Sequence, residues 1–220
     1  GLRQTGKTWL LMDFGNKQYE HTLYINLETD RSATDYLSVP HDPQEVLLFL
    51  ETCAGKPLRP ASSLLILDNI QCIPQISTLL TSIALDFPQY HIASIYKGVV
   101  NSDSFSVHDF DILTLYPLDF EEFLWANGIE TPVIELLKTC LQNEKTVPEA
   151  LHKRMKQLLL QYTVVGGMPD VVQTFVSTKQ MDEVLQIQRD IVRSYEDDMI
   201  KYAEKKDKSR IKECFQSIPK

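Results

Sequence analysis

The 220-residue sequence lacks long apolar runs, an excess of basic residues and a signal peptide. Its longest uninterrupted apolar stretches, such as Val46–Leu50, are about five residues, whereas a membrane-spanning helix needs about 20. The net charge of −8 argues against a broad nucleic-acid footprint. We therefore expect a globular protein without a membrane span, located by default in the cytoplasm.

Cysteine pairs and metal-binding histidine spacings are also absent. The five histidines show no metal-ligand spacing, and the four cysteines are scattered without a C-x-x-C pair: Cys53, Cys72, Cys140 and Cys214. This usage fits reduced thiols in a cytosolic protein better than disulfides or zinc. No disulfide or zinc cluster is predicted.

The strongest functional pattern is in the first eight residues, GLRQTGKT, which fit the phosphate-binding loop G-x-x-x-x-G-K-[ST]. Gly1 and Gly6 permit backbone angles and a close approach that a Cβ would forbid, so successive N–H groups can point at phosphate oxygens. Lys7 would sit across the β- and γ-phosphates, and the Thr8 hydroxyl would hold Mg²⁺. The loop predicts ATP and Mg²⁺ as ligands.

The residues within and after this loop extend the predicted site. The run Trp9–Phe14 indicates a helix whose N-terminus faces the anion, so Thr5 and Trp9 are counted among the nucleotide-binding residues. Arg3 has two interpretations, a phosphate contact or a side chain facing solvent or a neighbouring subunit. Because such a loop normally connects a buried strand to a helix, a chain that starts at Gly1 is expected to be a fragment, poorly stable without that strand.

A second anchor is Ser63–Asp68, a continuous apolar run that ends in a carboxylate. Such a run is typical of a strand buried on both faces of a parallel sheet. In phosphate-loop enzymes the acid at the end of this strand meets the Mg²⁺ held by the loop Ser or Thr. We therefore predict Asp68 and Thr8 as the metal ligands.

The first half alternates strands and helices. A helix follows Asp42 and ends at Gly55, and a second is predicted over Pro74–Leu85. The remaining strand signals are His21–Leu27, His91–Ser94 and Phe110–Leu115. This alternation predicts an α/β sheet with parallel strands and with ligands outside their carboxyl ends.

From residue 117 the strand signal stops. Helices are predicted at Phe120–Asn127, Pro132–Gln142, Pro148–Tyr162, Asp170–Phe175 and Gln180–Ala203. We place a boundary near residue 116, between a nucleotide-binding α/β domain, 1–116, and an all-helical lid, 117–220.

Several segments resemble a prokaryotic AAA-type ATPase family, in which an ATPase domain is followed by a C-terminal domain of unknown function. Besides the loop, they are Leu64–Gln71, Leu115–Leu124, Gly166–Asp170 and Gln188–Tyr195. The resemblance implies an additional-strand P-loop sheet, with the absent first strand between two others near its centre. It also implies a C-terminal domain after Lys220.

The sequence departs from that family directly after the second anchor. The family's usual Asp-Glu pair is Asp68-Asn69 here, and an Asn amide has no basicity with which to take a proton from water. Asn69 could still hydrogen-bond the attacking water, and we keep it with Lys7 and Asp68 as a catalytic candidate. Glu28 or Asp30 could substitute as the base, or be exposed acids on a strand-to-helix turn.

A second departure follows the strand at His91–Ser94. The family usually carries a Gly-Ser pair there, where a polar group can sense the γ-phosphate, whereas this chain has Ile95-Tyr96. Ser94 is the nearest polar candidate, with a plain strand-end hydroxyl as the alternative.

Three functions fit these residues. The leading one is an AAA-type ATPase that couples MgATP binding and hydrolysis to movement of its C-terminal domain, alone or as an oligomer, on an unknown protein or nucleic-acid client. The second is a nucleotide-binding switch with impaired hydrolysis, because of Asn69. The third is a DNA-associated regulator, which needs a basic surface. No such surface is visible in the sequence. One group of basic residues could touch nucleic-acid phosphates, but the acids interspersed among them favour a charged exposed helix: Lys201, Lys205, Lys206, Lys208, Arg210 and Lys212.

Overall fold

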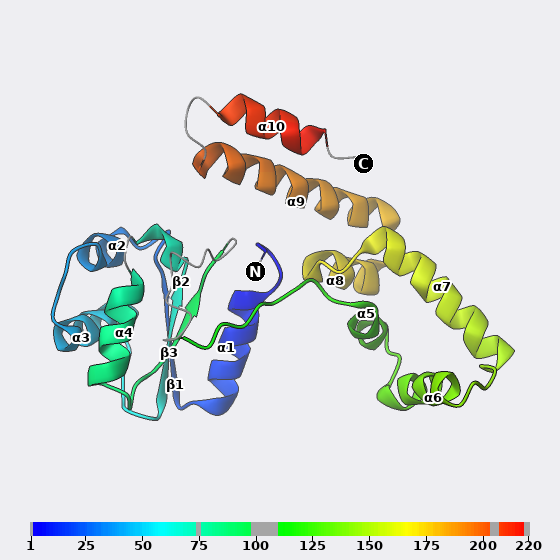
Figure 1. Cartoon of the computed structure of the whole chain (residues 1–220), viewed down its shortest axis with the longest axis horizontal. Helices are drawn as coiled ribbons and strands as arrows, with labels where there is room; N and C mark the ends of the chain where they lie inside the picture. Colours follow the sequence, from blue (N-terminus) through cyan, green and yellow to red (C-terminus); the bar gives the residue numbers. More distant parts are fainter. Residues whose placement is uncertain (1, 74–75, 98–109, 203–206, 218–220) are drawn as a thin grey trace. The chain divides into compact units, whose positions relative to one another are not determined.

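The computed structural model describes residues 2–73, 76–97, 110–202 and 207–217. Five residues with predicted roles lie outside these ranges: Gly1, Pro74, Ala203, Lys205 and Lys206. The chain divides into two compact units, Gly1–Tyr116 and Pro117–Lys220. The first is an α/β unit and the second is helical (Figure 1). None of the helices in the described ranges combines the length and apolar character needed to cross a membrane.

Among the described residues of the first unit, three parallel strands form a sheet in the order β1 (His21–Asn26), β2 (Ser63–Asp68) and β3 (His91–Ile95). Their register places Asn26 beside Asp68, and Asp68 beside Ile95. All three strands therefore end at one edge, as expected for a parallel sheet that presents its functional groups there.

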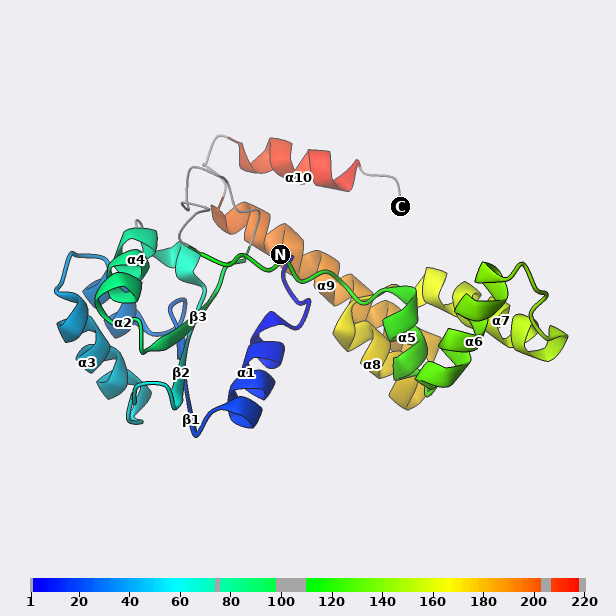
Figure 2. The same ribbon diagram turned by 60° about the horizontal axis from the view of Figure 1, so that its bottom comes forward.

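Helices cover both faces of this sheet. Helix α1 (Lys7–Gln18) packs against all three strands on one face. The opposite face is covered by α2 (Arg31–Leu37), α3 (Pro43–Ala54) and α4 (Ile76–Asp86), as Figures 1 and 2 show. The predicted α/β class with a parallel P-loop sheet is confirmed.

The fully buried strand β2 shows how the apolar run divides between the two faces. Because side chains alternate along a strand, Leu64 and Ile66 pack toward α1. Leu65 and Leu67 enter the larger core on the other face. Continuing this alternation, Asp68 lies on the α1 side.

Local signals set the helix ends in this unit. Asp42 caps α3 by accepting a 2.9 Å hydrogen bond from the Gln44 N–H, and Gly55 ends the helix in the left-handed region at φ 61°. Asp30 caps α2 in the same way, accepting a 3.0 Å hydrogen bond from the Ala33 N–H.

The strand predicted at Phe110–Leu115 is wrong. These residues run as irregular chain, and Leu113 is 94% exposed. No strand in the described part of the chain pairs with them. A β-prone segment without a ladder partner satisfies its backbone groups with water instead, so propensity alone does not make it a strand.

The described part of the second unit contains six helices: α5 (Phe120–Ala126), α6 (Thr131–Gln142), α7 (Glu149–Val165), α8 (Pro169–Thr178), α9 (Met181–Tyr202) and α10 (Lys208–Gln216). A capping box begins α5, because Asp119 and Glu122 each accept a hydrogen bond from the other's backbone N–H. The core gathers around Phe123, Leu158 and Phe175. Helix α10 packs along α9 (Figure 2).

Three of the family-like segments meet inside this helical unit. The Gly167 carbonyl accepts a 2.7 Å hydrogen bond from the Leu118 N–H, and a Cβ at Gly167 would lie 2.0 Å from the Leu118 carbonyl oxygen. The Tyr162 hydroxyl donates to that same carbonyl. Gln188 donates to the carbonyls of Val164 and Val165 at the end of α7. The three family-like segments are therefore joined to one another and to the end of α7 by backbone and side-chain hydrogen bonds.

Candidate functional site

The loop before α1 has the backbone that its glycine pattern predicts. Gly6 lies in the left-handed region at φ 84° directly before the helix, and Gln4 is also left-handed at φ 61°. No described side chain caps α1. The N–H groups of its first turn, at Lys7, Thr8 and Trp9, therefore lie at a helix N-terminus of the kind that can bind an anion. Trp9 is 70% exposed, so the group that it offers at the start of α1 is its backbone N–H.

Lys7 folds back over the loop. Its Nζ donates to the Leu2 carbonyl and, at 3.4 Å, to the buried Thr5 hydroxyl. Burial lowers the pKa of Lys7, and repulsion by Lys97 and then Arg3 lowers it further, against an opposing effect of Asp68. Thr5 itself donates a 3.1 Å hydrogen bond to Leu2. The loop thus concentrates positive charge that a phosphate would neutralise.

Thr8 and Asp68 are brought together as predicted for a metal pair. The Thr8 hydroxyl donates a 2.7 Å hydrogen bond to Asp68 Oδ2, and Asp68 is 1% exposed. Tyr24, which shares the α1 face of the sheet, donates to the same oxygen at 2.9 Å. Burial, and then its hydrogen bond to Asp68, raises the pKa of Tyr24 to about 12. Tyr24 was not predicted as a site residue. Its position on β1 places its side chain on the α1 face of the sheet, where Asp68 also lies.

Lys97 was also missed. Its Nζ lies 3.3 Å from Asp68 Oδ1, with 19% of its side chain exposed. This contact is an ion pair without hydrogen-bond geometry, because Oδ1 is buried and has no hydrogen-bond partner. The position of Lys97 along the chain could have indicated this contact. Ile95 pairs with Asp68, and Lys97 follows two residues later on the same face.

Asn69 is completely buried and follows β2 in the left-handed region at φ 63°. Its Nδ2 donates a 2.8 Å hydrogen bond to Asn26 Oδ1, and its Oδ1 accepts from Gln71 at 3.1 Å. Gln71 Oε1 in turn accepts from the Lys97 backbone N–H at 3.2 Å. Asn69 therefore connects the ends of the three strands, and its predicted contact with water stays a prediction.

The remaining candidates take different places. Arg3 forms a 3.8 Å ion pair with Glu28, which fixes Glu28 beside the loop. The Asp30 carboxylate caps α2 by accepting a hydrogen bond from the Ala33 N–H. Ser94 is exposed and pairs with Leu67, one residue before the level of Asp68, so Lys97 and not Ser94 reaches the carboxylate.

The residues at this edge fit Mg²⁺. Its preferred ligands are hard oxygens, and the Thr8 hydroxyl and the Asp68 carboxylate supply them side by side. The buried Asp68 Oδ1 accepts no hydrogen bond and faces only the Lys97 ammonium among the described groups, so a metal cation would fit there. Within the described ranges, no group of three or more His, Cys, Asp or Glu could hold a metal. Because Mg²⁺ usually keeps several waters and binds substrate phosphates, such groups would complete its shell here.

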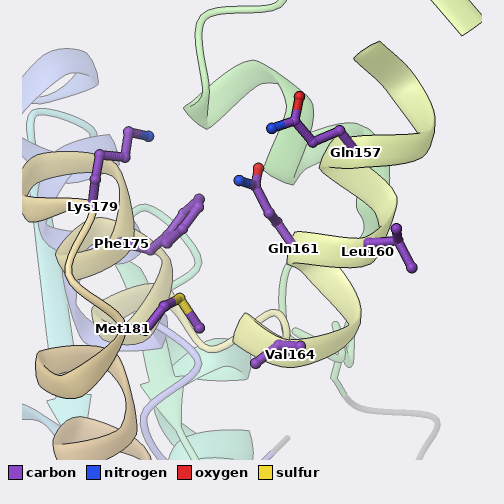
Figure 3. Close-up of a pocket in the computed structure, with 7 residues that line it drawn as sticks. All are labelled: Gln157, Leu160, Gln161, Val164, Phe175, Lys179 and Met181. Atoms are coloured by element: carbon purple, nitrogen blue, oxygen red, sulfur yellow. The ribbon is translucent and has the colours of Figure 1, made fainter. Parts of the chain in front are cut away.

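A hollow of about 360 Å³ lies within the helical unit (Figure 3). The Phe175 ring and Met181 form one wall, opposite the amides of Gln157 and Gln161. Lys179, also on this wall, already donates to Asn127 and lies over the Phe175 ring. This hollow therefore has far less charge to offer a ligand than the sheet edge.

A parallel sheet with helices on both faces, and a glycine loop that leads into α1, define the P-loop-like class of α/β proteins. A family model described as "AAA domain" matches residues 1–124, more than half of the chain. The chain therefore belongs to this AAA-type nucleotide-binding ATPase family. A second model, a domain of unknown function (DUF8612), matches residues 156–220. No curated protein matches the chain.

These matches confirm the resemblance to an AAA-type domain accompanied by a domain of unknown function. The match at 156–220 lies inside the chain, over α7 to α10. A further domain after Lys220 stays a prediction.

Proposed function

We propose that the chain binds MgATP with the loop of residues 1–8 and Asp68, and that nucleotide binding and hydrolysis move a C-terminal domain. The observation that carries this proposal is the 2.7 Å hydrogen bond from Thr8 to Asp68, because it joins two predicted metal ligands that are 60 residues apart in sequence. The charge at Lys7 and the uncapped N-terminus of α1 support the phosphate site.

Each residue has a defined part in this proposal. Lys7 and the N–H groups of Gly6, Thr8 and Trp9 hold the phosphates, while Thr8 and Asp68 share the Mg²⁺. When bound, Mg²⁺ neutralises charge on the phosphates. The helical unit 117–220 is the proposed lid, which passes the nucleotide state to a further domain.

A nucleotide-binding switch with impaired hydrolysis is the second candidate, and Asn69 favours it. Its amide has no basicity, and both ends of that amide are engaged by Asn26 and Gln71. Loss of a general base costs about 10²- to 10⁴-fold in rate. Glu28, held beside the loop by Arg3, is the carboxylate best placed to act in its stead.

Steady-state ATP turnover with Mg²⁺ separates the two candidates. The natural protein is compared with Lys7→Ala and Asn69→Glu. Lys17→Ala is the matched control, because Lys17 is exposed near the far end of α1 and pairs with Asp13. Turnover that Lys7→Ala abolishes supports an ATPase. Turnover gained only in Asn69→Glu supports the switch.

A further inference from the structure

The proposed function gives no role to Lys97, which faces Asp68 at the sheet edge. The side chain of its partner Asp68 is only 2% exposed, and the two charged groups lie 3.3 Å apart. A buried carboxylate without a counter-charge is strongly unfavourable, so Lys97 supplies the charge that stabilises Asp68 in this structure.

The position of Lys97 is fixed by the ends of the strands. Its backbone N–H donates to Gln71, which is itself bonded to Asn69. The parallel register continues from Ile95, opposite Asp68, so that the lysine lies on the α1 face. Lys97 is therefore built into the edge and differs from a solvated surface lysine.

Lys97 and a metal ion would need the same oxygen. Asp68 Oδ2 already accepts from Thr8 and Tyr24, which leaves Oδ1 for a cation. Lys97 faces Oδ1 without forming a hydrogen bond to it.

We propose that Lys97 is a positioning residue that neutralises Asp68 in place of the metal and is displaced from it by Mg²⁺. Lys97 thereby sets how strongly nucleotide binding depends on Mg²⁺. This inference rests on the proposed function, because it needs nucleotide and metal to bind at this edge.

The test is the affinity of the full chain for ADP, measured by titration calorimetry in EDTA and in excess Mg²⁺. The readout is the ratio of the two dissociation constants, EDTA over Mg²⁺, which involves no hydrolysis. Lys97→Met removes the competitor, and Lys97→Arg restores its charge. Lys56→Met is the matched control, since Lys56 is exposed and contacts Thr22 near the start of β1, away from Asp68.

In Lys97→Met we expect the ratio to rise by about 5- to 150-fold, the usual range of coupling between two ligands. Lys97→Arg and Lys56→Met should stay near the natural ratio. An unchanged ratio in Lys97→Met, with ADP still bound, would overturn this inference and leave the proposed function standing. Absence of ADP binding to the natural chain in Mg²⁺ would overturn both.

If Lys97→Met unfolds, Lys97→Gln gives the same comparison with a polar side chain. Melting temperature provides a second readout. Mg²⁺ alone should raise the melting temperature of the folded variant more than that of the natural protein, since Asp68 then lacks its internal cation. An equal rise in both would contradict the proposal.

Discussion

Thr8 and Asp68 are joined by a 2.7 Å hydrogen bond at the carboxyl edge of the sheet. Thr8→Val keeps the branched shape of the side chain but removes the hydroxyl. We expect the affinity for nucleotide in Mg²⁺ to fall by about tenfold or more, with a smaller loss in EDTA, since the variant lacks a proposed metal ligand. Titration calorimetry measures both, and Thr52→Val on the exposed side of α3 is the control. Equal losses with and without Mg²⁺ would contradict a metal role for Thr8.

The raised pKa of Tyr24 makes the free energy of unfolding depend on pH in the alkaline range. Its pKa in the folded protein, about 12, lies above the ordinary value of 10.0. The protonated hydroxyl therefore stabilises the fold fully below pH 10, and this contribution disappears as the pH rises through 12. Tyr24→Phe should lower the free energy of unfolding at neutral pH by about 1.5 to 3 kcal/mol, the value of a hydrogen bond to a charged group.

Denaturant unfolding between pH 8 and about 12 checks this prediction, and the difference between the natural protein and Tyr24→Phe is the quantity to follow. Tyr116→Phe is the control, because Tyr116 is 73% exposed. A difference that does not shrink with rising pH would count against the Tyr24–Asp68 hydrogen bond.

The pKa of Lys7 reports on the charge around the loop. It is lowered from the ordinary 10.5 by burial and by Lys97. We expect it to rise in Lys97→Met, and again when inorganic phosphate binds, because each change removes repulsion or adds an opposite charge. Carbon-13 NMR titration of the lysine side chains measures the shift. A Lys7 pKa that is the same in Lys97→Met would mean that the two ammonium groups do not interact.

Gly167 is a steric requirement of the helical unit. A Cβ there would lie 2.0 Å from the Leu118 carbonyl oxygen, a backbone atom that cannot move aside cheaply. Gly167→Ala should therefore destabilise this unit by about 3 kcal/mol or more. Gly128→Ala, at φ 78° but in open space, should cost only about 1 kcal/mol. Thermal unfolding compares the two, and equal costs would show that the contact with Leu118 is not rigid.

Much of the site could be predicted because its signals are local. The glycine loop and the apolar run ending in Asp68 each have a recognisable sequence pattern. The loop pattern indicates the start of a helix, and the apolar run indicates a strand buried on both faces of a parallel sheet. Tyr24 and Lys97 could not be found in this way. Their approach to Asp68 depends on which face of each strand they occupy and on the register between strands.

The prediction at Phe110–Leu115 was wrong for a related reason. Its composition favours a strand, but a strand exists only with a partner, and composition does not name one. Asn69 shows the same limit. Its identity predicted poor basicity, whereas its burial and its bonds to Asn26 and Gln71 became visible only with the fold.

The most direct test of the central proposal is the binding of MgATP to the full chain, measured by titration calorimetry at one salt concentration. We predict one site per chain in the natural protein and in Lys17→Ala. Lys7→Ala should bind at least about tenfold more weakly, because a charge contact to the phosphates is lost. Equal affinity in Lys7→Ala, or no binding to the natural chain, would contradict the assignment of this edge as the nucleotide site.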